Sequence, residues 1–113
     1  MDEKNEILYL FGFSPNKVMQ LKNLLMILKV QIINHKRVAV VLIHDGVIGL
    51  SRKINLPILV NELLDLPIKV YGLIPDIAAR GIDIEDIHQK VKCIQYEDLV
   101  DLIATTPIIA SWI

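Results

Sequence analysis

Apolar residues in this chain form short unbroken runs, which alternate with longer sets of apolar residues at helical spacing. Unbroken runs rich in β-branched residues are typical of strands buried on both faces of a parallel sheet. Such runs lie at residues 6–13, 38–43, 68–73 and 91–95, and residues 108–113 favour a short last strand. Helical spacing is found at residues 15–33, 56–64, 75–80 and 97–104. Because strands alternate with helices, we expect one α/β domain over residues 1–113, with helices on both faces of about five mainly parallel strands.

Serine, proline and glycine mark the expected ends of the helices. Ser14 and Pro15 are predicted to be the N-cap and the first residue of the first helix, and Pro57 the first residue of the second. Pro75 is expected at the first position of the short third helix, which Gly81 is expected to end. The turn before Pro75 therefore lies at the edge of the sheet where α/β proteins commonly bind ligands.

Three of the predicted strands end in turns that converge at this edge, because the carboxyl ends of parallel strands lie together. The crevice between the turns is the expected ligand site or subunit interface. Its candidate residues are Ser14, His44, Asp45, Gly46, Pro75, Asp76 and Arg80.

Each polar group in the crevice also has a purely structural interpretation. His44 could transfer a proton or bind a ligand, but a strand that ends at His44 before an Asp45-Gly46 turn is favoured. Asp76 and Arg80 lie four residues apart, a spacing that predicts a stabilising ion pair within the short helix. The sequence has no cluster of His, Cys, Asp or Glu with metal-ligand spacing, so neither a metal nor a cofactor is expected.

Cys93 is the one cysteine of the chain, which excludes an internal disulfide and fits a reducing compartment. It lies within a predicted strand, and cysteine is among the residue types most often buried. A structural role is therefore favoured over a reactive thiolate, which needs solvent access and a cationic neighbour or a helix N-terminus.

The composition is unusually apolar for a small domain. Hydrophobic residues make up 53% of the chain, and the mean hydropathy is +0.48. A domain of this size cannot bury all of that surface internally. Lysines, asparagine and glutamine interrupt the longest apolar stretch, residues 21–33, so a membrane-spanning helix is not expected. A cytoplasmic protein with oligomeric interfaces is the better interpretation.

The net charge and the last aromatic residue, Trp112, bear on which partners the chain could have. The net charge is -1 and the isoelectric point is about 6.3, which argues against nucleic acid as a direct partner. Trp112 lies near the C-terminus, where a large aromatic side chain serves either as a lid on the core or as an interface anchor.

Four segments, in order along the chain, resemble the DsrH/TusB family of small sulfur-relay subunits. They are an early strand leading to Ser14-Pro15, an apolar strand ending in Asp45-Gly46-Val47, the segment KVYGLIPDIAARG at 69–81, and YEDLVDL at 96–102 with Trp112. The resemblance implies a DsrE/DsrF/DsrH-like three-layer α/β/α fold with a five-stranded, mainly parallel sheet. It also implies a cytoplasmic subunit of a sulfurtransferase complex, in which homologous subunits form hexamers. Such complexes pass persulfide sulfur onward in tRNA 2-thiouridine synthesis or in sulfur oxidation.

The chain departs from the family pattern where the relatives hold sulfur. Sister subunits that transfer sulfur have a cysteine at the turn matching residues 73–75, and some DsrH proteins have one in the region matching residues 22–25. Neither segment contains cysteine here, and Cys93 matches no family cysteine. The resemblance therefore implies a scaffolding, non-catalytic subunit, at most accessory to an enzyme. Its partners would be homologous DsrE/DsrF-like (TusC/TusD-like) subunits or copies of itself.

Two other functions stay open at the level of sequence. One is a stand-alone homo-oligomer that binds a small ligand near His44, Asp45 and Asp76. The other makes Cys93 a sulfur acceptor and the chain a weak sulfurtransferase.

Overall fold

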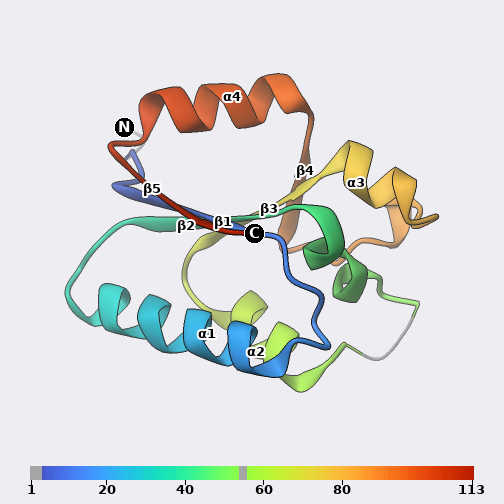
Figure 1. Cartoon of the computed structure of the whole chain (residues 1–113), viewed down its shortest axis with the longest axis horizontal. Coiled ribbons are helices and arrows are strands. Elements are labelled where there is room, and N and C mark those ends of the chain that lie inside the picture. Colours follow the sequence, from blue (N-terminus) through green and yellow to red (C-terminus); the bar gives the residue numbers. More distant parts are fainter. Residues whose placement is uncertain (1–3, 54–55) are drawn as a thin grey trace.

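A five-stranded sheet forms the centre of the computed structural model, which describes residues 4–53 and 56–113 (Figure 1). The strands are β1 (Ile7–Phe11), β2 (Val38–Leu42), β3 (Lys69–Leu73), β4 (Val91–Ile94) and β5 (Ile108–Trp112). Their order across the sheet is β4-β3-β2-β1-β5, and each of these neighbouring pairs is parallel. The expected mainly parallel sheet is confirmed.

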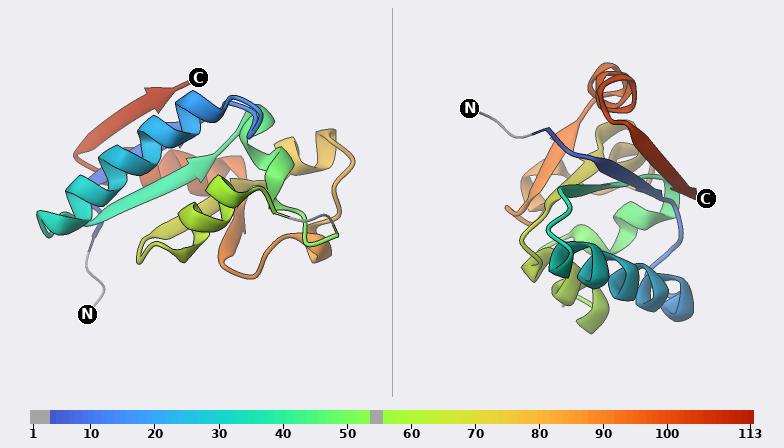
Figure 2. Two further views of the ribbon diagram at one scale, coloured as in Figure 1. Left: turned by 90° about the horizontal axis from the view of Figure 1, so that it is seen from below. Right: turned by 90° about the vertical axis from the view of Figure 1, so that its left-hand side faces the viewer.

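Helices cover both faces of this sheet, so the three-layer α/β/α fold is confirmed as well (Figures 1 and 2). The helices are α1 (Val18–Ile33), α2 (Ile58–Asp65), α3 (Ile74–Ala79) and α4 (Tyr96–Thr105). Within the described residues, the 3₁₀ segments η1 (His44–Leu50) and η2 (Ile84–Asp86) complete the elements. The pair α1 and α2 lies below the sheet in Figure 1, whereas α4 lies above it.

The strands divide their side chains between two apolar cores, because successive residues of a strand point to opposite faces. All five residues of the central strand β2 are buried. Val38, Val40 and Leu42 belong to the core between the sheet and the pair α1 and α2, while Ala39 and Val41 belong to the core between the sheet and α4. This burial on both faces explains the unbroken apolar run of β2.

The predicted start of the first helix is wrong. The helix begins at Val18, and Lys17 occupies the N-cap position without a side-chain cap. The Ser14 hydroxyl instead accepts a hydrogen bond from the Asn16 N–H at 3.2 Å, and the Ser14 carbonyl accepts one from the Lys17 N–H at 2.8 Å. These local bonds fold Ser14-Pro15 into a separate turn, since a serine hydroxyl competes well for nearby backbone groups.

The other helix boundaries differ from the expected ones by at most two residues. Pro57 is the N-cap of α2 rather than its first residue, with an extended ψ of 145°. Pro75 is the second residue of α3, which already begins at Ile74. Gly81 adopts a left-handed φ of 69° just after α3, which confirms it as the residue that ends this helix.

Candidate functional site

The carboxyl ends of β1, β2 and β3 converge, as the sequence predicts. The Ile43 N–H, just after β2, donates to the carbonyl of Phe11 at the end of β1, at 3.0 Å. The backbone of Gly46 lies so close to the end of β1 that a Cβ atom at residue 46 would be 2.6 Å from the same carbonyl oxygen. Only glycine allows this approach, and it brings η1 into the crevice between the strand ends.

Asp76 connects α3 to the start of η1. Its Oδ2 accepts a hydrogen bond from the His44 backbone N–H at 2.7 Å and lies 4.0 Å from the His44 Nδ1. His44 has a positive φ of 49°, a conformation that costs a non-glycine residue about 1 kcal/mol or more. The hydrogen bond that His44 donates to Asp76 offsets this cost, so the carboxylate holds the turn in place. His44 is thus the first residue of η1, not the last residue of a strand as predicted.

Arg80 joins the same two elements from the other side. Its Nε and Nη2 donate to Asp45 Oδ1 at 3.1 and 3.0 Å, and its Nη1 donates to the Asp76 carbonyl at 3.2 Å. The predicted ion pair between the Asp76 and Arg80 side chains is therefore wrong. The Asp76 carboxylate is used by His44, and the guanidinium turns to Asp45, 35 residues earlier in the chain.

Among the charged residues of the crevice, Asp76 is therefore the one whose removal should lower the stability of the fold most. We expect Asp76→Ala to lower the free energy of unfolding by about 1–3 kcal/mol, because the His44 N–H loses a charged partner whose side chain is only 13% exposed. Asp45→Ala removes an exposed ion pair and is expected to cost about 1 kcal/mol or less. Urea unfolding of both variants measures the difference, and equal losses would contradict the role given to Asp76.

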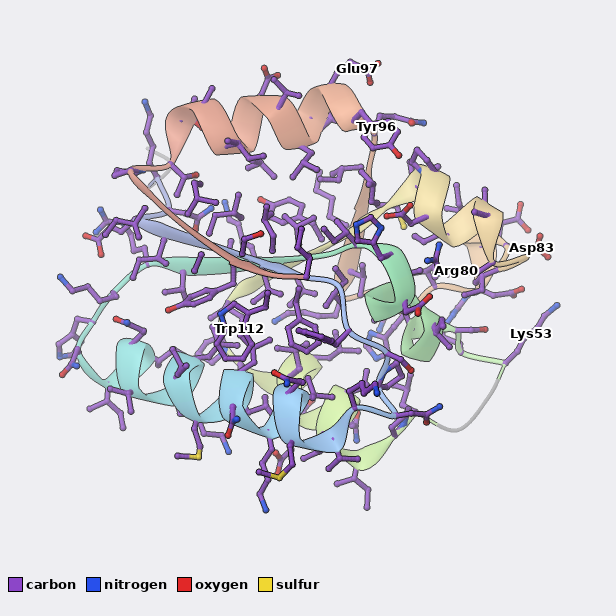
Figure 3. The ribbon with its side chains drawn as sticks, in the orientation of Figure 1. Lys53, Arg80, Asp83, Tyr96, Glu97 and Trp112 are labelled. Atoms are coloured by element: carbon purple, nitrogen blue, oxygen red, sulfur yellow. The ribbon has the colours of Figure 1, made fainter. Side chains whose placement is uncertain are left out.

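A hollow of about 450 Å³ lies beside this network, over η1 and the end of α3. It is lined by Ile48, Ser51, Lys53, Arg80, Gly81, Ile82, Asp83 and Asp86. Figure 3 shows Lys53, Arg80 and Asp83 at this end of the molecule. Lys53 Nζ lies 3.2 Å from Asp86 Oδ2, so the two basic and two acidic groups of the lining leave little net charge.

The structure thus brings together only some of the site residues that the sequence predicts. His44, Asp45, Asp76 and Arg80 share one network, and Gly46 permits it. Pro75 belongs to the first turn of α3, next to Asp76, whereas Ser14 bonds to its own turn. Of the predicted residues, Arg80 alone is among those that line the hollow. The remaining lining comes from segments whose sequences lack any clear ligand motif, so sequence patterns could not identify it.

Cys93 lies on β4 in register with Gly72 of β3, and its side chain is half-buried. It borders a second hollow, of about 260 Å³, between β4 and α4. Burial raises the pKa of the Cys93 thiol above its ordinary value, so the thiolate fraction at neutral pH falls.

This raised pKa predicts slow alkylation of Cys93. At pH 7 to 8, iodoacetamide should react with the folded chain more slowly than with a small model thiol of ordinary pKa, since the thiolate is the nucleophile. The rate should still be rising with pH where the model thiol has levelled off, above about pH 8.5. Mass spectrometry over a pH series measures this, with the urea-unfolded chain as the control. A folded chain that reacts as fast as the unfolded one would refute the prediction.

Trp112, on β5, packs against the core on the α1 side. Its ring centroid lies 6.1 Å from that of Phe11, with an angle of 45° between the planes. The side chain is only partly buried there, as a lid at the edge of the core would be (Figure 3). Its role as an interface anchor stays a prediction.

The part of the chain that the structure describes has neither a metal-binding cluster nor a membrane-spanning helix. No three His, Cys, Asp or Glu side chains there are grouped so that they could hold a metal ion. Within the same residues, none of the helices has the length and apolar character needed to cross a membrane.

Solved structures identify the class of fold. The ychN protein from E. coli aligns with a TM-score of 0.75 at 12% identity, over 96% of this chain and 99% of that one. The protein MTH1491 from Methanobacterium thermoautotrophicum aligns with a TM-score of 0.71 at 16% identity, over the same shares of the two chains. The chain therefore has a DsrEFH-like α/β fold.

Sequence comparison then identifies the family. A model described as DsrH like protein matches residues 14–107. Protein TusB of Pectobacterium carotovorum subsp. carotovorum (strain PC1) is 35% identical over 74 residues, which are 66% of this chain and 74% of that protein. This chain belongs to the DsrH-like family, and the resemblance found in its motifs is confirmed.

Proposed function

We propose that this chain is a scaffolding subunit of a cytoplasmic sulfur-relay complex and that it does not itself transfer sulfur. Its partners would be homologous DsrE/DsrF-like (TusC/TusD-like) subunits that provide the cysteine. The complex would act in tRNA 2-thiouridine synthesis or in sulfur oxidation, the two settings that the family resemblance implies.

The observation that carries this proposal is the apolar turn between β3 and α3. Leu73 is buried, and Ile74 and Pro75 are partly buried. The family resemblance implies a cysteine at the matching turn of the sister subunits that transfer sulfur. Persulfide chemistry needs a thiolate nucleophile, and these three side chains offer none. The next residue, Asp76, is used to hold His44. The turn is therefore suited to packing and to joining elements, and a partner would have to supply the nucleophile.

Cys93 gives no ready substitute for the missing thiol. It is half-buried in a strand, and its raised pKa disfavours the thiolate. When the folded chain meets a persulfide donor, we expect intact mass spectrometry to show no added sulfur atom. The chain unfolded in urea should gain sulfur and serves as the control. Sulfur that adds to the folded chain and is lost in Cys93→Ser would overturn the non-catalytic role and make Cys93 a sulfur acceptor.

The partner is tested separately, by affinity purification of the tagged chain from the cells that make it. We expect a homologous α/β chain with a cysteine at its β3–α3 turn to copurify in fixed proportion. Recovery of the tagged chain without such a subunit would overturn the scaffolding role.

A second candidate function is the binding of a small ligand, which the hollow of about 450 Å³ near Lys53 and Arg80 favours. This volume is within the range of small-molecule sites. The hollow adjoins, rather than contains, the predicted ligand residues His44 and Asp76. Native mass spectrometry of the purified chain tests this function, and a retained small molecule that is lost in Arg80→Ala would support it.

A further inference from the structure

Three lysines border a hollow at the amino ends of β3 and β4. The hollow has a volume of about 280 Å³, and its lining comprises Ile68, Lys69, Val70, Tyr71, Lys90 and Lys92. None of the described residues in this lining is acidic, so the three lysines give it a formal charge of +3. The chain as a whole has a net charge of -1, so positive charge is concentrated at this point. We call Lys69, Lys90 and Lys92 the lysine cluster.

The sheet places Lys69 and Lys92 on the same face. Lys92 is in register with Tyr71, and Lys69 precedes Tyr71 by two residues, so all three side chains point to the α4 side. The rise along a strand and the spacing between strands put the Cα atoms of the two lysines about 8 Å apart. Both lysines are exposed, and their flexible four-carbon stems allow the two ammonium groups to converge on one ion.

Lys90 is held in place beside the same hollow. Its Nζ donates a hydrogen bond to the carbonyl of Leu66 at 2.8 Å, in a partly buried contact. That bond uses one of the three ammonium N–H groups and leaves two for a ligand. The hollow therefore has one fixed positive charge and two adjustable ones.

The charges of the lysine cluster are not compensated within the described residues. Neither Lys69 nor Lys92 forms an ion pair there, and Lys90 bonds to a neutral carbonyl. The amino ends of β1 and β2 differ, because Arg37 Nη2 lies 3.3 Å from Glu6 Oε1. Basic residues at this edge of the sheet thus have a carboxylate partner at β1 and β2, whereas those at β3 and β4 have none among the described residues.

Two carboxylates lie near the cluster without neutralising it. Asp98 and Asp101 of α4 line the hollow of about 260 Å³ beside Cys93, which Lys92 also borders. Asp98 Oδ2 accepts a hydrogen bond from the Gln95 N–H at 3.0 Å, as part of the capping of α4. Among the described residues, neither carboxylate forms an ion pair with Lys92. The lysines therefore repel one another, since they are closer than the screening length of about 10 Å in 0.1 M salt.

We propose that the lysine cluster binds a small oxyanion of the phosphate class. A phosphate dianion matches three ammonium groups better than a carboxylate, which has a single charge and only two oxygens. Its tetrahedral oxygens accept N–H bonds from several directions, as lysines on two strands require. The volume of about 280 Å³ is just below the usual range of small-molecule sites, about 300–1,000 Å³, so it suits a compact ligand.

The ligand is either free phosphate or the phosphate end of a small organic molecule. Both sources offer the same recognised group, and the test below separates them. This site lies apart from the hollow near Lys53 and Arg80, whose lining shares no residue with it. The proposal does not depend on the role in sulfur relay.

Titration of the whole chain with inorganic phosphate and with glycerol 3-phosphate tests the proposal. At about pH 8 phosphate is mainly a dianion. At constant low ionic strength, we expect saturable changes in the NMR amide signals of residues 68–71 and 90–92. The probe that binds more tightly identifies the source of the phosphate group. Sodium chloride at the same ionic strength is the control for screening and should not reproduce these changes.

Lys69→Gln/Lys92→Gln should weaken phosphate binding at least about tenfold, because two charged hydrogen-bond donors are lost. Lys17→Gln/Lys22→Gln is the matched control. It removes the same charge from exposed positions at the start of α1 and should bind phosphate as the wild type does.

Stability distinguishes a ligand site from a structural role of the lysines. Because Lys69 and Lys92 repel each other in the free chain, Lys69→Gln/Lys92→Gln should be at least as stable to urea as the wild type without phosphate. Phosphate should raise the Tm of the wild type, at fixed ionic strength, and leave that of the double variant unchanged.

Three results would overturn the proposal. They are NMR changes that chloride reproduces, a Lys69→Gln/Lys92→Gln variant that binds phosphate normally, and the same variant losing stability when no phosphate is present. Binding of an oligoglutamate peptide without binding of either phosphate probe would also overturn it. That result would assign the lysine cluster to an acidic protein segment instead.

Discussion

Replacing Gly46 by alanine is expected to lower the free energy of unfolding by about 3 kcal/mol or more, the range of severe strain and overpacking effects. The added Cβ would lie 2.6 Å from the Phe11 carbonyl oxygen, and this oxygen belongs to the backbone of β1, an internal strand of the sheet. Backbone there cannot move without breaking the 3.0 Å bond from the Ile43 N–H. Urea unfolding followed by circular dichroism measures the loss.

Gly81→Ala is the matched control. It measures the stability cost of an unfavourable backbone conformation without the cost of a steric clash. Gly81 has a φ of 69°, but a Cβ there would meet no atom within 4 Å. Its replacement should cost only about 1 kcal/mol, the usual penalty of a left-handed conformation for alanine. A Gly46→Ala variant no less stable than Gly81→Ala would show that η1 can move away from β1.

Phe11→Ala should have a comparably large effect, a loss of about 3–5 kcal/mol of unfolding free energy. The side chain is 2% exposed and lies edge-on to Phe13 at a centroid distance of 5.7 Å, with Trp112 on another side. Truncation would leave a cavity where β1, β5 and α1 meet. Thermal and urea unfolding both report this loss.

Ile58→Ala removes a similar kind of side chain from a site that is 81% exposed, at the start of α2. Its effect should stay within about 0.5 kcal/mol, as for most surface substitutions. If Phe11→Ala proved as mild as Ile58→Ala, the core between β1 and α1 would have to rearrange around the missing ring.

The fold was largely predictable from the chain because its strongest signals are local. The apolar run at residues 38–43 requires burial on both sides, and that requirement alone places β2 inside a sheet with helices on both faces. Helix starts were less predictable. Ser14-Pro15 satisfies the sequence preferences of a helix start, but a hydrogen bond to Asn16 makes a separate turn there.

The sequence predicts which residues form the candidate site, but not which hydrogen bonds join them. The convergence of His44, Asp45 and Asp76 follows from parallel topology, which the sequence indicates. The choice of partner for Arg80 depends on the distance from α3 to η1, which no local spacing encodes. Residues 47–50 show no helical or strand pattern in the sequence, because a 3₁₀ segment such as η1 lacks the periodicity of a helix or a strand. The hollow beside η1 was therefore missed.

The strand order also has a consequence for how the chain reaches its native state. Strands β1 to β4 pair with their neighbours in sequence, so this part of the sheet can grow step by step while the polypeptide is being synthesised. The strand β5 instead returns across the sheet to pair with β1, with Ile7 opposite Ile108. This closure joins segments far apart in the sequence, and such long-range pairing is the slow part of folding. Until it occurs, β1 has an open edge, and the nascent chain is exposed to mispairing on that side.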